Sequence, residues 1–407
     1  MAGVFASMNT DIRTVLIVGG GQAGAAAAFS LRARGFDGRL VLLGTESHLP
    51  YERPQLSKQV LQPADNEVKL IRSEEDYILA GIELRLGTTL LDVDAERQSA
   101  LLDDGSTLDY DRLLVATGVR PRMLQGISGP RVTCLRTIED AISLRTGLYE
   151  GAVIAIIGGG VIGLEVASAV AARGGKPIVI EAGDRLMGRS INKRVASFLD
   201  EVHRRQGAEI IYGVTATSLT AEGSLHLSDG STMTVDRVLV CVGVQPNNEP
   251  FVNCGITDTM GVRVDSLGRT CVPTIYATGD IASQPVRGQY SRVETWANAQ
   301  HHAELVAGNI IGGEEPFNQP MWFWSDQGDL NLQVLGDVTT GVEVLREGSS
   351  DDAFSIFYLS DEGRLLGCVS INSPKDMAMA RRWIRDGALL DQTRLAESSV
   401  NLRGCVL

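Results

Sequence analysis

Short apolar runs that end in glycine recur along this chain. Residues 15–18 are β-branched or leucine, the composition of a strand that is buried on both faces of a parallel sheet. A glycine-rich turn follows, and the alanine-rich segment 25–31 after it favours a helix. A second apolar run occupies 39–43. The order strand, helix, strand predicts a βαβ unit with parallel strands.

The turn after the first strand places Gly19, Gly21 and Gly24 at the spacing G-x-G-x-x-G. The first glycine permits a tight turn, the second lets a pyrophosphate approach the backbone, and the third lets helix and strand pack closely. Between a strand and a helix, whose N-terminal N–H groups bind phosphates, the turn predicts a bound dinucleotide. After the second strand, Glu46 is a candidate acid for the adenosine ribose; whether Thr45 or Glu46 makes that contact stays open.

The same pattern returns in the middle of the chain, with Gly158, Gly160 and Gly163 between an apolar strand and a helix. The strand after that helix ends in Glu181. A carboxylate there binds the 2′-hydroxyl of NAD and repels the 2′-phosphate of NADP. Two such units predict two dinucleotide sites, and FAD in one with NADH in the other gives a path for hydride. Arg189 follows and is either a phosphate contact or a surface arginine.

Other segments complete the two dinucleotide-binding units, and a distinct third segment begins at Pro320. Strands are expected at 113–118, 152–157, 177–180, 238–243 and 275–280, β-meanders at 82–108 and 213–235, and helices at 164–173, from 294 onward and at 375–385.

Two clusters leave alternatives open. His301 and His302 have no ligand spacing with other His or Cys, so surface or capping roles are favoured over metal binding. Trp322, Phe323 and Trp324 fit no single face of a helix or strand. Either one ring abuts a ligand or partner, or the three belong to an aromatic core.

Composition and charge narrow the class of protein. A net charge of −13 argues against binding nucleic acid or an anionic membrane surface. No apolar run reaches the roughly 18 residues of a membrane span, and no basic stretch followed by an apolar one precedes Val15, so a cytoplasmic protein is expected. The cysteines form no C-x-x-C pair and none precedes Cys134, so buried inert thiols and no metal site are expected.

Taken together, the motifs resemble those of the FAD-dependent NADH:ferredoxin reductases of bacterial multicomponent oxygenase systems, of the putidaredoxin reductase and biphenyl dioxygenase reductase type. The similarity covers the chain from about Arg13. Besides the two glycine turns, it rests on the segments 51–54, 56–58, 109–113, 116–118, 135–137, 277–280, 294–296 and 322–327.

The resemblance implies an α/β fold that is glutathione-reductase-like, with two Rossmann-like dinucleotide-binding domains plus a small α+β C-terminal interface domain. The expected segments are 1–117 and 244–320 for FAD binding, 118–243 for NADH binding and 321–407 for the interface domain.

The resemblance also carries site residues onto this chain. FAD contacts are expected at Gly19, Gly21, Ala23, Gly24, Glu46, Arg53, Lys58, Leu90, Arg136, Asp280 and Trp296. NADH contacts are expected at Gly158, Gly160, Ile162, Gly163, Glu165, Glu181, Arg189 and Glu294. The chain departs from the family pattern at Thr45, where relatives usually carry an acid, and at Gln55, where they carry a second proline.

The interpretation of Lys58 depends on the resemblance. From its loop alone, Lys58 is interpreted as a solvated surface lysine. The resemblance instead places its ammonium beside flavin N5 and O4, paired with Glu165, and both residues are then expected to be catalytic. A fixed cation there stabilises the negative charge that develops when hydride arrives, while the isoalloxazine carries the chemistry.

The expected activity is hydride transfer from NADH to FAD, followed by single-electron transfer to a 2Fe–2S ferredoxin that supplies an oxygenase. Related disulfide reductases and peroxidases use cysteine in the loop 51–58, which has none here, so electrons leave from the flavin itself. Docking is expected at Trp324, with a basic rim of Arg381, Arg382 and Arg385. A monomer or weak homodimer is expected. The alternatives are a rubredoxin or other small-acceptor NADH reductase, and a flavoprotein of the apoptosis-inducing-factor type.

Overall fold

The computed structural model describes residues 12–62 and 67–407. Contacts divide the chain into two units, of which the first comprises Met1–Glu52, Val68–Arg120 and Val244–Gln319, and the second Arg53–Glu67, Pro121–Gly243 and Pro320–Leu407. The four expected domain segments stay a prediction. Residues 1–11, where the first of those segments begins and on which the expected localisation partly rests, lie outside the described residues.

The first unit is built on a five-stranded parallel sheet with the strand order β20-β7-β1-β2-β3. Val15 pairs with Leu40 on one side and with Arg112 on the other. The strand order reverses at β1, and open parallel sheets bind ligands at the carboxyl ends of the strands at such a point. The strands are β1 (Thr14–Val18), β2 (Arg39–Gly44), β3 (Ile82–Leu86), β7 (Arg112–Val115) and β20 (Ile275–Ala277).

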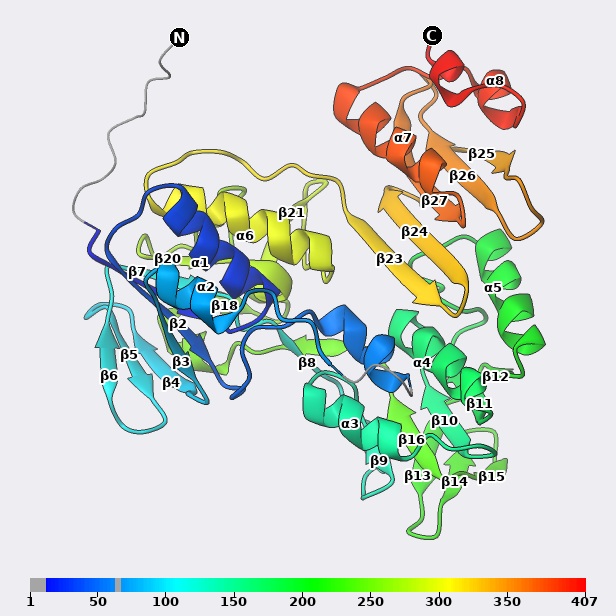
Figure 1. Ribbon diagram of the computed structural model, residues 1–407, viewed down its shortest axis with the longest axis horizontal. Coiled ribbons are helices and arrows are strands. Elements are labelled where there is room, and N and C mark those ends of the chain that lie inside the picture. The colour runs from blue at the N-terminus through cyan, green and yellow to red at the C-terminus, as the bar shows by residue number, and fades with distance from the viewer. Residues whose placement is uncertain (1–11, 63–66) are drawn as a thin grey trace. The chain divides into compact units, whose positions relative to one another are not determined.

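Helices α1 (Gln22–Ala33) and α6 (Trp296–Ile310) lie side by side along this sheet (Figure 1). Ala27 and Ala303 are fully buried in the core that the two helices share. Their small side chains let the helix backbones approach closely. The short helix α2 (Glu74–Leu79) packs beside β3.

The segment 82–108 differs from the expected meander. Its first strand, β3, joins the parallel sheet, with Leu40 opposite Ile82. Alternating side chains indicate a strand but do not specify its neighbour, and the neighbour here is β2, which is distant in sequence. The antiparallel meander contains only β4 (Leu90–Asp94), β5 (Ser99–Leu102) and β6 (Thr107–Asp109).

The second unit repeats the parallel arrangement, with the strand order β12-β11-β10-β16-β9. The strands are β9 (Val132–Thr133), β10 (Val153–Ile157), β11 (Lys176–Glu181), β12 (Glu209–Tyr212) and β16 (Arg237–Val240). The helices are α3 (Ile138–Thr146), α4 (Val161–Ala172) and α5 (Lys193–Arg205), and the meander consists of β13 (Ala216–Leu219), β14 (Ser224–Leu227) and β15 (Thr232–Thr234). The expected repeat of strand, glycine turn, helix and meander is confirmed.

Smaller elements complete the two units. A two-stranded ladder is formed by β8 (Val119–Pro121) and β17 (Val244–Pro246), and a four-stranded sheet by β18 (Thr257–Asp258), β19 (Gly261–Arg263), β21 (Ala282–Val286) and β22 (Gln289–Ser291). Short 3-10 helices are η1 (Arg53–Ser57), η2 (Gln59–Leu61), η3 (Glu249–Cys254), η4 (Gly279–Ile281) and η5 (Leu402–Cys405).

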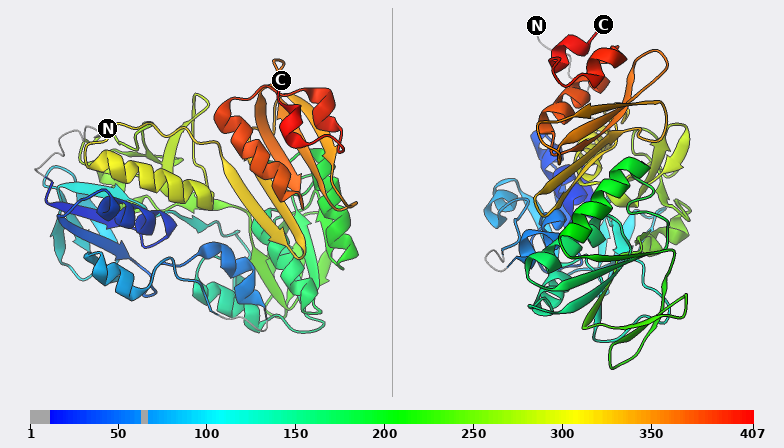
Figure 2. Two further views of the ribbon diagram at one scale, coloured as in Figure 1. Left: turned by 45° about the horizontal axis from the view of Figure 1, so that its top comes forward. Right: turned by 90° about the vertical axis from the view of Figure 1, so that its right-hand side faces the viewer.

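The C-terminal part of the second unit is an antiparallel sheet ordered β23-β24-β27-β26-β25. Helix α7 (Pro374–Asp386) packs on this sheet and buries Trp383 against it, and α8 (Gln392–Ala396) follows (Figure 2). The expected α+β arrangement and the helix at 375–385 are confirmed. The strands are β23 (Trp322–Gln327), β24 (Leu330–Gly336), β25 (Val342–Glu347), β26 (Phe354–Leu359) and β27 (Leu365–Ile371).

His302 lies in the core of the first unit, which corrects the expected surface or capping role. Its side chain is fully buried on α6, and its ring centroid lies 4.8 Å from that of Phe317. Neither ring nitrogen has a hydrogen-bond partner among the described residues. Burial lowers the pKa of His302 to about 3, so the ring is neutral. His301 beside it is partly exposed.

Within residues 12–62 and 67–407, no group of three or more His, Cys, Asp or Glu side chains is placed to hold a metal ion. No helix in that same part of the chain is both long and apolar enough to cross a membrane.

Candidate functional site

The first glycine turn leaves no room for a side chain at two positions. A Cβ on Gly19 would lie 2.1 Å from the carbonyl oxygen of Ala116, and the residue has a φ of +123°. A Cβ on Gly24 would lie 1.9 Å from the carbonyl oxygen of Gly19. Both distances are far inside van der Waals contact. The strand ends and α1 therefore approach this closely only because these positions are glycine.

The second glycine turn has the same construction. A Cβ on Gly158 would lie 2.5 Å from the carbonyl oxygen of Cys241, and one on Gly163 would lie 2.2 Å from that of Gly158. The steric roles expected for the first and third glycines are thus confirmed in both turns.

The middle glycine of each turn borders open space. Gly21 is the N-cap of α1 and Gly160 the N-cap of α4, and neither makes a side-chain capping hydrogen bond. Apart from the glycine itself, its two chain neighbours and the backbone of its own helix, no atom of the described residues lies within 4 Å of a Cβ built on either position. Each helix therefore directs uncapped N–H groups and its positive dipole end at an open space. That arrangement fits the pyrophosphate of a dinucleotide.

Three other expected FAD contacts lie in the first unit. Ala23 is in the first turn of α1, and its methyl group would lie 2.8 Å from a Cβ on Gly279, so α1 lies directly against η4, which contains Asp280. Trp296 begins α6 and lines, with Gln22, a cleft between the two helices. The structure thus brings these segments together at α1.

The side chains of Glu46 and Leu90 contact other residues of the first unit. The carboxylate of Glu46 accepts a hydrogen bond of 2.6 Å from the Tyr51 hydroxyl, while Thr45 is exposed. Leu90 is 5% exposed and packs in the core of the first unit. Their assignment as FAD contacts stays a prediction.

Three further expected site residues form contacts that involve an arginine. In the second unit, the Arg53 guanidinium donates a 2.7 Å hydrogen bond to the backbone carbonyl of Arg136. In the first unit, Glu294 forms an ion pair of 2.8 Å with Arg292. Their contacts with FAD and NADH also stay predictions.

Glu181 ends β11 and bends back to the second glycine turn. One carboxylate oxygen accepts a hydrogen bond of 2.8 Å from the Gly159 N–H, and the other accepts one of 2.7 Å from the Gly183 N–H. The acid is therefore fixed beside the open end of the turn, the place of a nucleotide ribose in this type of fold. Ile162 in the first turn of α4 is 40% exposed although apolar, and Arg189 is exposed. Both are accessible to a ligand.

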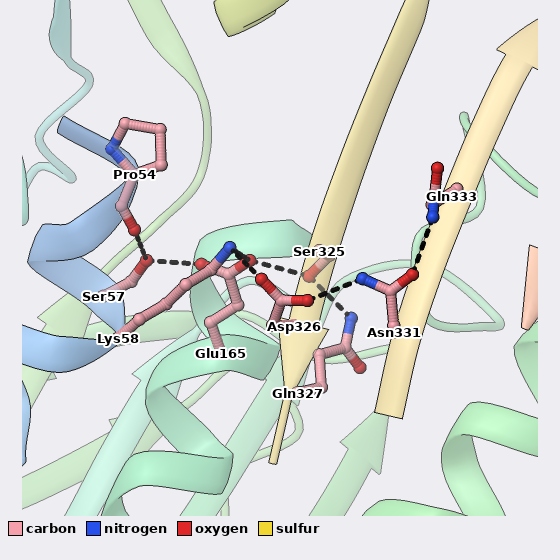
Figure 3. A network of polar contacts seen from close by, with 9 residues as sticks. All are labelled: Pro54, Ser57, Lys58, Glu165, Ser325, Asp326, Gln327, Asn331 and Gln333. Carbon is pink, nitrogen blue, oxygen red and sulfur yellow. Dashed lines mark hydrogen bonds and ion pairs between the residues drawn. The ribbon is translucent and has the colours of Figure 1, made fainter. Parts of the chain in front are cut away.

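Lys58 and Glu165 lie together, as expected. The Nζ of Lys58 is 3.4 Å from a Glu165 carboxylate oxygen, and the two side chains are only 12% and 4% exposed (Figure 3). Lys58 directly follows η1, and Glu165 lies on α4. A second carboxylate, that of Asp326 on β23, is 2.9 Å from the same Nζ. The pairing of Lys58 with Glu165 is confirmed, and the catalytic role of the two residues stays a prediction.

Glu165 accepts hydrogen bonds from two serine hydroxyls. Ser57 donates to one carboxylate oxygen, and Ser325 donates to the other at 2.8 Å. Burial raises the pKa of Glu165, and the Lys58 ammonium and the two hydroxyls offset that increase only in part.

Polar contacts extend from this pair in two directions. Gln327 donates to the Ser325 hydroxyl at 3.1 Å, and its side-chain oxygen lies 2.8 Å from Nε2 of the buried His203. Asn331 donates a 2.7 Å hydrogen bond to Asp326. Burial would raise the pKa of Asp326, but the Lys58 ammonium and the Asn331 amide outweigh it and hold that pKa below its usual value.

Ser57, Ser325 and Asp326 were not predicted from the sequence as partners of Lys58 and Glu165. All three lie inside the motifs 56–58 and 322–327, so the segments were identified without the contacts. Side chains alternate between the two faces of a strand, so Trp324 and Asp326 lie on the same face of β23. This alternation is the sequence pattern that could have indicated Asp326 as part of the site. That this face meets Lys58 follows only from the tertiary structure.

The aromatic residues of β23 form a stacked column with two cations. The rings of Trp322 and Trp324 lie 5.2 Å apart with an interplanar angle of 27°. The Arg381 guanidinium lies 4.1 Å from the centroid of Trp322, and Lys58 Nζ lies 5.4 Å from that of Trp324. Phe323 occupies the opposite face of the strand. The three aromatics thus divide between two faces, and two of them connect α7 with Lys58.

The other two arginines of the expected docking rim share one carboxylate. Nε of Arg382 is 3.3 Å from Asp386, and Nε of Arg385 is 2.9 Å from it. All three arginines of α7 are exposed. The positive charge of this surface is therefore reduced by Asp386 but not abolished.

Comparisons with known proteins agree with this geometry. Residues 13–303 match the family described as pyridine nucleotide-disulphide oxidoreductase, and residues 322–406 match the family described as reductase C-terminal. A curated relative from Pseudomonas putida, the ferredoxin–NAD(+) reductase component of a p-cumate 2,3-dioxygenase system, is 50% identical over 402 residues. The match covers 98% of this chain and 100% of the relative.

Solved structures give the same result. A ferredoxin reductase from Rhodopseudomonas palustris has a TM-score of 0.92 and 35% identity, over 97% of this chain and 100% of that one. A chain of the covalent putidaredoxin reductase–putidaredoxin complex has a TM-score of 0.91 and 30% identity, over 98% of both chains.

Proposed function

The chain belongs to the pyridine nucleotide-disulphide oxidoreductase family, and from that premise we propose that it is the NADH-dependent ferredoxin reductase of a multicomponent oxygenase system. FAD and NAD(H) are its cofactors. The relative from Pseudomonas putida is named as such a reductase component and matches over its whole length. The covalent complex of putidaredoxin reductase with putidaredoxin supports a ferredoxin as the partner protein.

Each of the two glycine turns would bind one of the two cofactors. The turn at Gly21 would hold the FAD pyrophosphate and the turn at Gly160 that of NADH, since each borders open space at an uncapped helix start. FAD, when bound, supplies the group that accepts hydride and releases electrons singly. Glu181, held by two backbone N–H groups, favours NADH by repelling a 2′-phosphate.

The proposal rests above all on the contacts of Lys58 with Glu165 and Asp326. A buried ammonium held by Glu165 and Asp326 is a preorganised positive charge, which stabilises negative charge that develops next to it. No cysteine lies in the loop 51–58, which is where related disulfide reductases relay electrons. The chain is therefore equipped to pass electrons from a flavin rather than from a thiol.

We propose a docking surface for a 2Fe–2S ferredoxin around Trp324 and α7. Arg381, Arg382 and Arg385 are exposed there, and ferredoxins are generally acidic. Rim charges of this kind mainly accelerate association. We also propose that the protein works as a monomer or weak homodimer in a reducing cytoplasm, which its six free cysteines support.

Steady-state NADH oxidation tests the proposal. We expect turnover that requires an added 2Fe–2S ferredoxin and is faster with NADH than with NADPH. Equal turnover with rubredoxin, or with no protein acceptor at all, would instead support a small-acceptor reductase. A protein that binds FAD and forms a stable reduced complex without reducing ferredoxin would favour a flavoprotein of the apoptosis-inducing-factor type.

A further inference from the structure

The Lys58 ammonium lies between two carboxylates that differ in their surroundings. Asp326 is the nearer, at 2.9 Å, and 43% of its side chain is exposed. Glu165 is at 3.4 Å, and 4% of its side chain is exposed. A buried carboxylate loses more hydration on ionising than a partly exposed one, so the two acids do not carry negative charge equally easily.

The hydrogen bonds of the two acids differ in the same sense. Both oxygens of Glu165 accept from neutral hydroxyls, those of Ser57 and Ser325. Asp326 uses one oxygen for the Lys58 ammonium and the other for the Asn331 amide. Each oxygen of Glu165 thus accepts from a hydroxyl while the ammonium lies 3.4 Å away, whereas one oxygen of Asp326 accepts directly from the ammonium at 2.9 Å.

The pKa shifts of Glu165 and Asp326 agree with these differences in burial and hydrogen bonding. Burial raises the pKa of Glu165 above its ordinary value. Burial acts in the same direction on Asp326, but the ammonium and the amide outweigh it and lower the pKa of that residue. The pKa values of the two acids are therefore shifted in opposite directions.

We propose that Asp326 is the principal counter-ion of Lys58 and positions its ammonium, while Glu165 acts mainly as a hydrogen-bonded anchor between η1, α4 and β23. The proposal concerns the site to which the proposed function assigns the flavin chemistry, and rests on that function for its effect on FAD. Asp326 is a positioning residue, because it acts through Lys58. The same strand carries Trp324, so β23 fixes the lysine by an ion pair and an aromatic ring face.

A first test measures the ion pairs without any catalytic assay. Asp326→Asn and Glu165→Gln each replace a carboxyl group by an amide of similar shape, and each is combined with Lys58→Met in the FAD-loaded protein. We expect the melting-temperature shifts of Lys58→Met and Asp326→Asn to deviate more from additivity than those of Lys58→Met and Glu165→Gln. A deviation that is equal for the two pairs, or larger for Glu165, overturns the proposal.

A second test measures the midpoint potential of bound FAD. Removing a negative charge near the flavin favours its reduced form, so Asp326→Asn should raise the potential more than Glu165→Gln does. Asp326→Glu restores the carboxylate and should return the potential toward that of the wild type. A larger rise with Glu165→Gln contradicts the assignment.

Asp352→Asn is the matched control, because Asp352 is a partly exposed carboxylate of the same unit that pairs with Arg205 at 3.4 Å. Its melting-temperature shift should add to that of Lys58→Met without deviation. It should also leave the midpoint potential of bound FAD unchanged. If ferredoxin were not reduced at all, the proposed function would fail, yet the melting-temperature cycle would still decide between the two counter-ions.

Discussion

The guanidinium of Arg381 lies over the indole of Trp322, 4.1 Å from the ring centroid. Through the stacked Trp324, this arginine of α7 is connected with Lys58. Arg381, which was expected at the rim of a docking surface, therefore also packs against the stacked rings of Trp322 and Trp324. Cation–π contacts at exposed sites contribute about 0.5–1 kcal/mol, enough to order a ring without immobilising it.

Charge reversal on α7 tests the docking surface. Arg381→Glu with Arg382→Glu should lower ferredoxin reduction and flatten its dependence on salt, because fewer charges attract the acidic partner. Reduction of ferricyanide, which needs no docking surface, should stay near that of the wild type. Arg394→Glu on α8 reverses an exposed charge elsewhere in the same part of the chain and should change neither rate. Equal losses with both acceptors would contradict the docking role.

Replacement of Glu181 tests the cofactor preference. The wild type should have a higher kcat/KM for NADH than for NADPH, and Glu181→Ala should narrow the difference, since the carboxylate that repels a 2′-phosphate is gone. Initial rates with both nucleotides measure this. Equal kcat/KM values for the wild type would show that Glu181 does not discriminate.

Replacement of Lys58 tests the preorganised charge. Lys58→Met keeps an unbranched side chain of nearly the same length but removes its charge, and should slow flavin reduction by about ten- to a thousandfold, on the order of 1.4–4 kcal/mol. Rapid mixing with NADH measures this step directly. Lys69→Met, at a lysine whose side chain is 66% exposed, serves as the control. An unchanged rate in Lys58→Met would refute the catalytic role.

Two alanine substitutions separate the binding and packing roles of glycine in the second turn. Gly160→Ala adds a methyl group where no described atom lies within 4 Å, so the protein should fold with FAD bound but show a raised KM for NADH. Gly163→Ala places a Cβ 2.2 Å from the carbonyl oxygen of Gly158, which forces the helix away from the strand. We expect a clear fall in melting temperature for that variant alone. Similar melting temperatures for both variants would contradict the assignment.

The buried His302 should make the protein sensitive to acid. Its pKa is lowered to about 3 in the folded state from an ordinary 6.5, so below pH 6.5 the unfolded chain binds a proton that the folded one does not. Stability is then lost as the pH falls from 6.5 toward 3, by about 2 kcal/mol at pH 5. His302→Leu should lose less stability than the wild type between pH 7 and pH 5.

Denaturant unfolding at the two pH values measures this difference, with His301→Leu as the control, since His301 is adjacent but partly exposed. An equal loss of stability in the wild type and His302→Leu would refute the contribution of His302.

Much of the fold and of the nucleotide sites was determined by local sequence. Apolar runs that end in glycine predict strand, turn and helix because each glycine meets a steric demand within a few residues, as at Gly19 and Gly24. Glu181 could be identified because its position at the end of a strand fixes it relative to the turn. Family motifs added Lys58 and Glu165, which lie on segments far apart in sequence.

Tertiary structure alone decided which side chains meet. Strand β3 pairs with β2 rather than with β4, the strand that follows it after a short turn, since alternation along a strand does not encode its partner. His302 was expected in a surface or capping role, but it is fully buried in the first unit, with its ring 4.8 Å from that of Phe317. The contact between Asp326 and Lys58 joins residues of distant segments through the placement of β23 against α4. Local sequence specifies the segments, whereas packing of distant segments determines the charges and rings that surround the lysine.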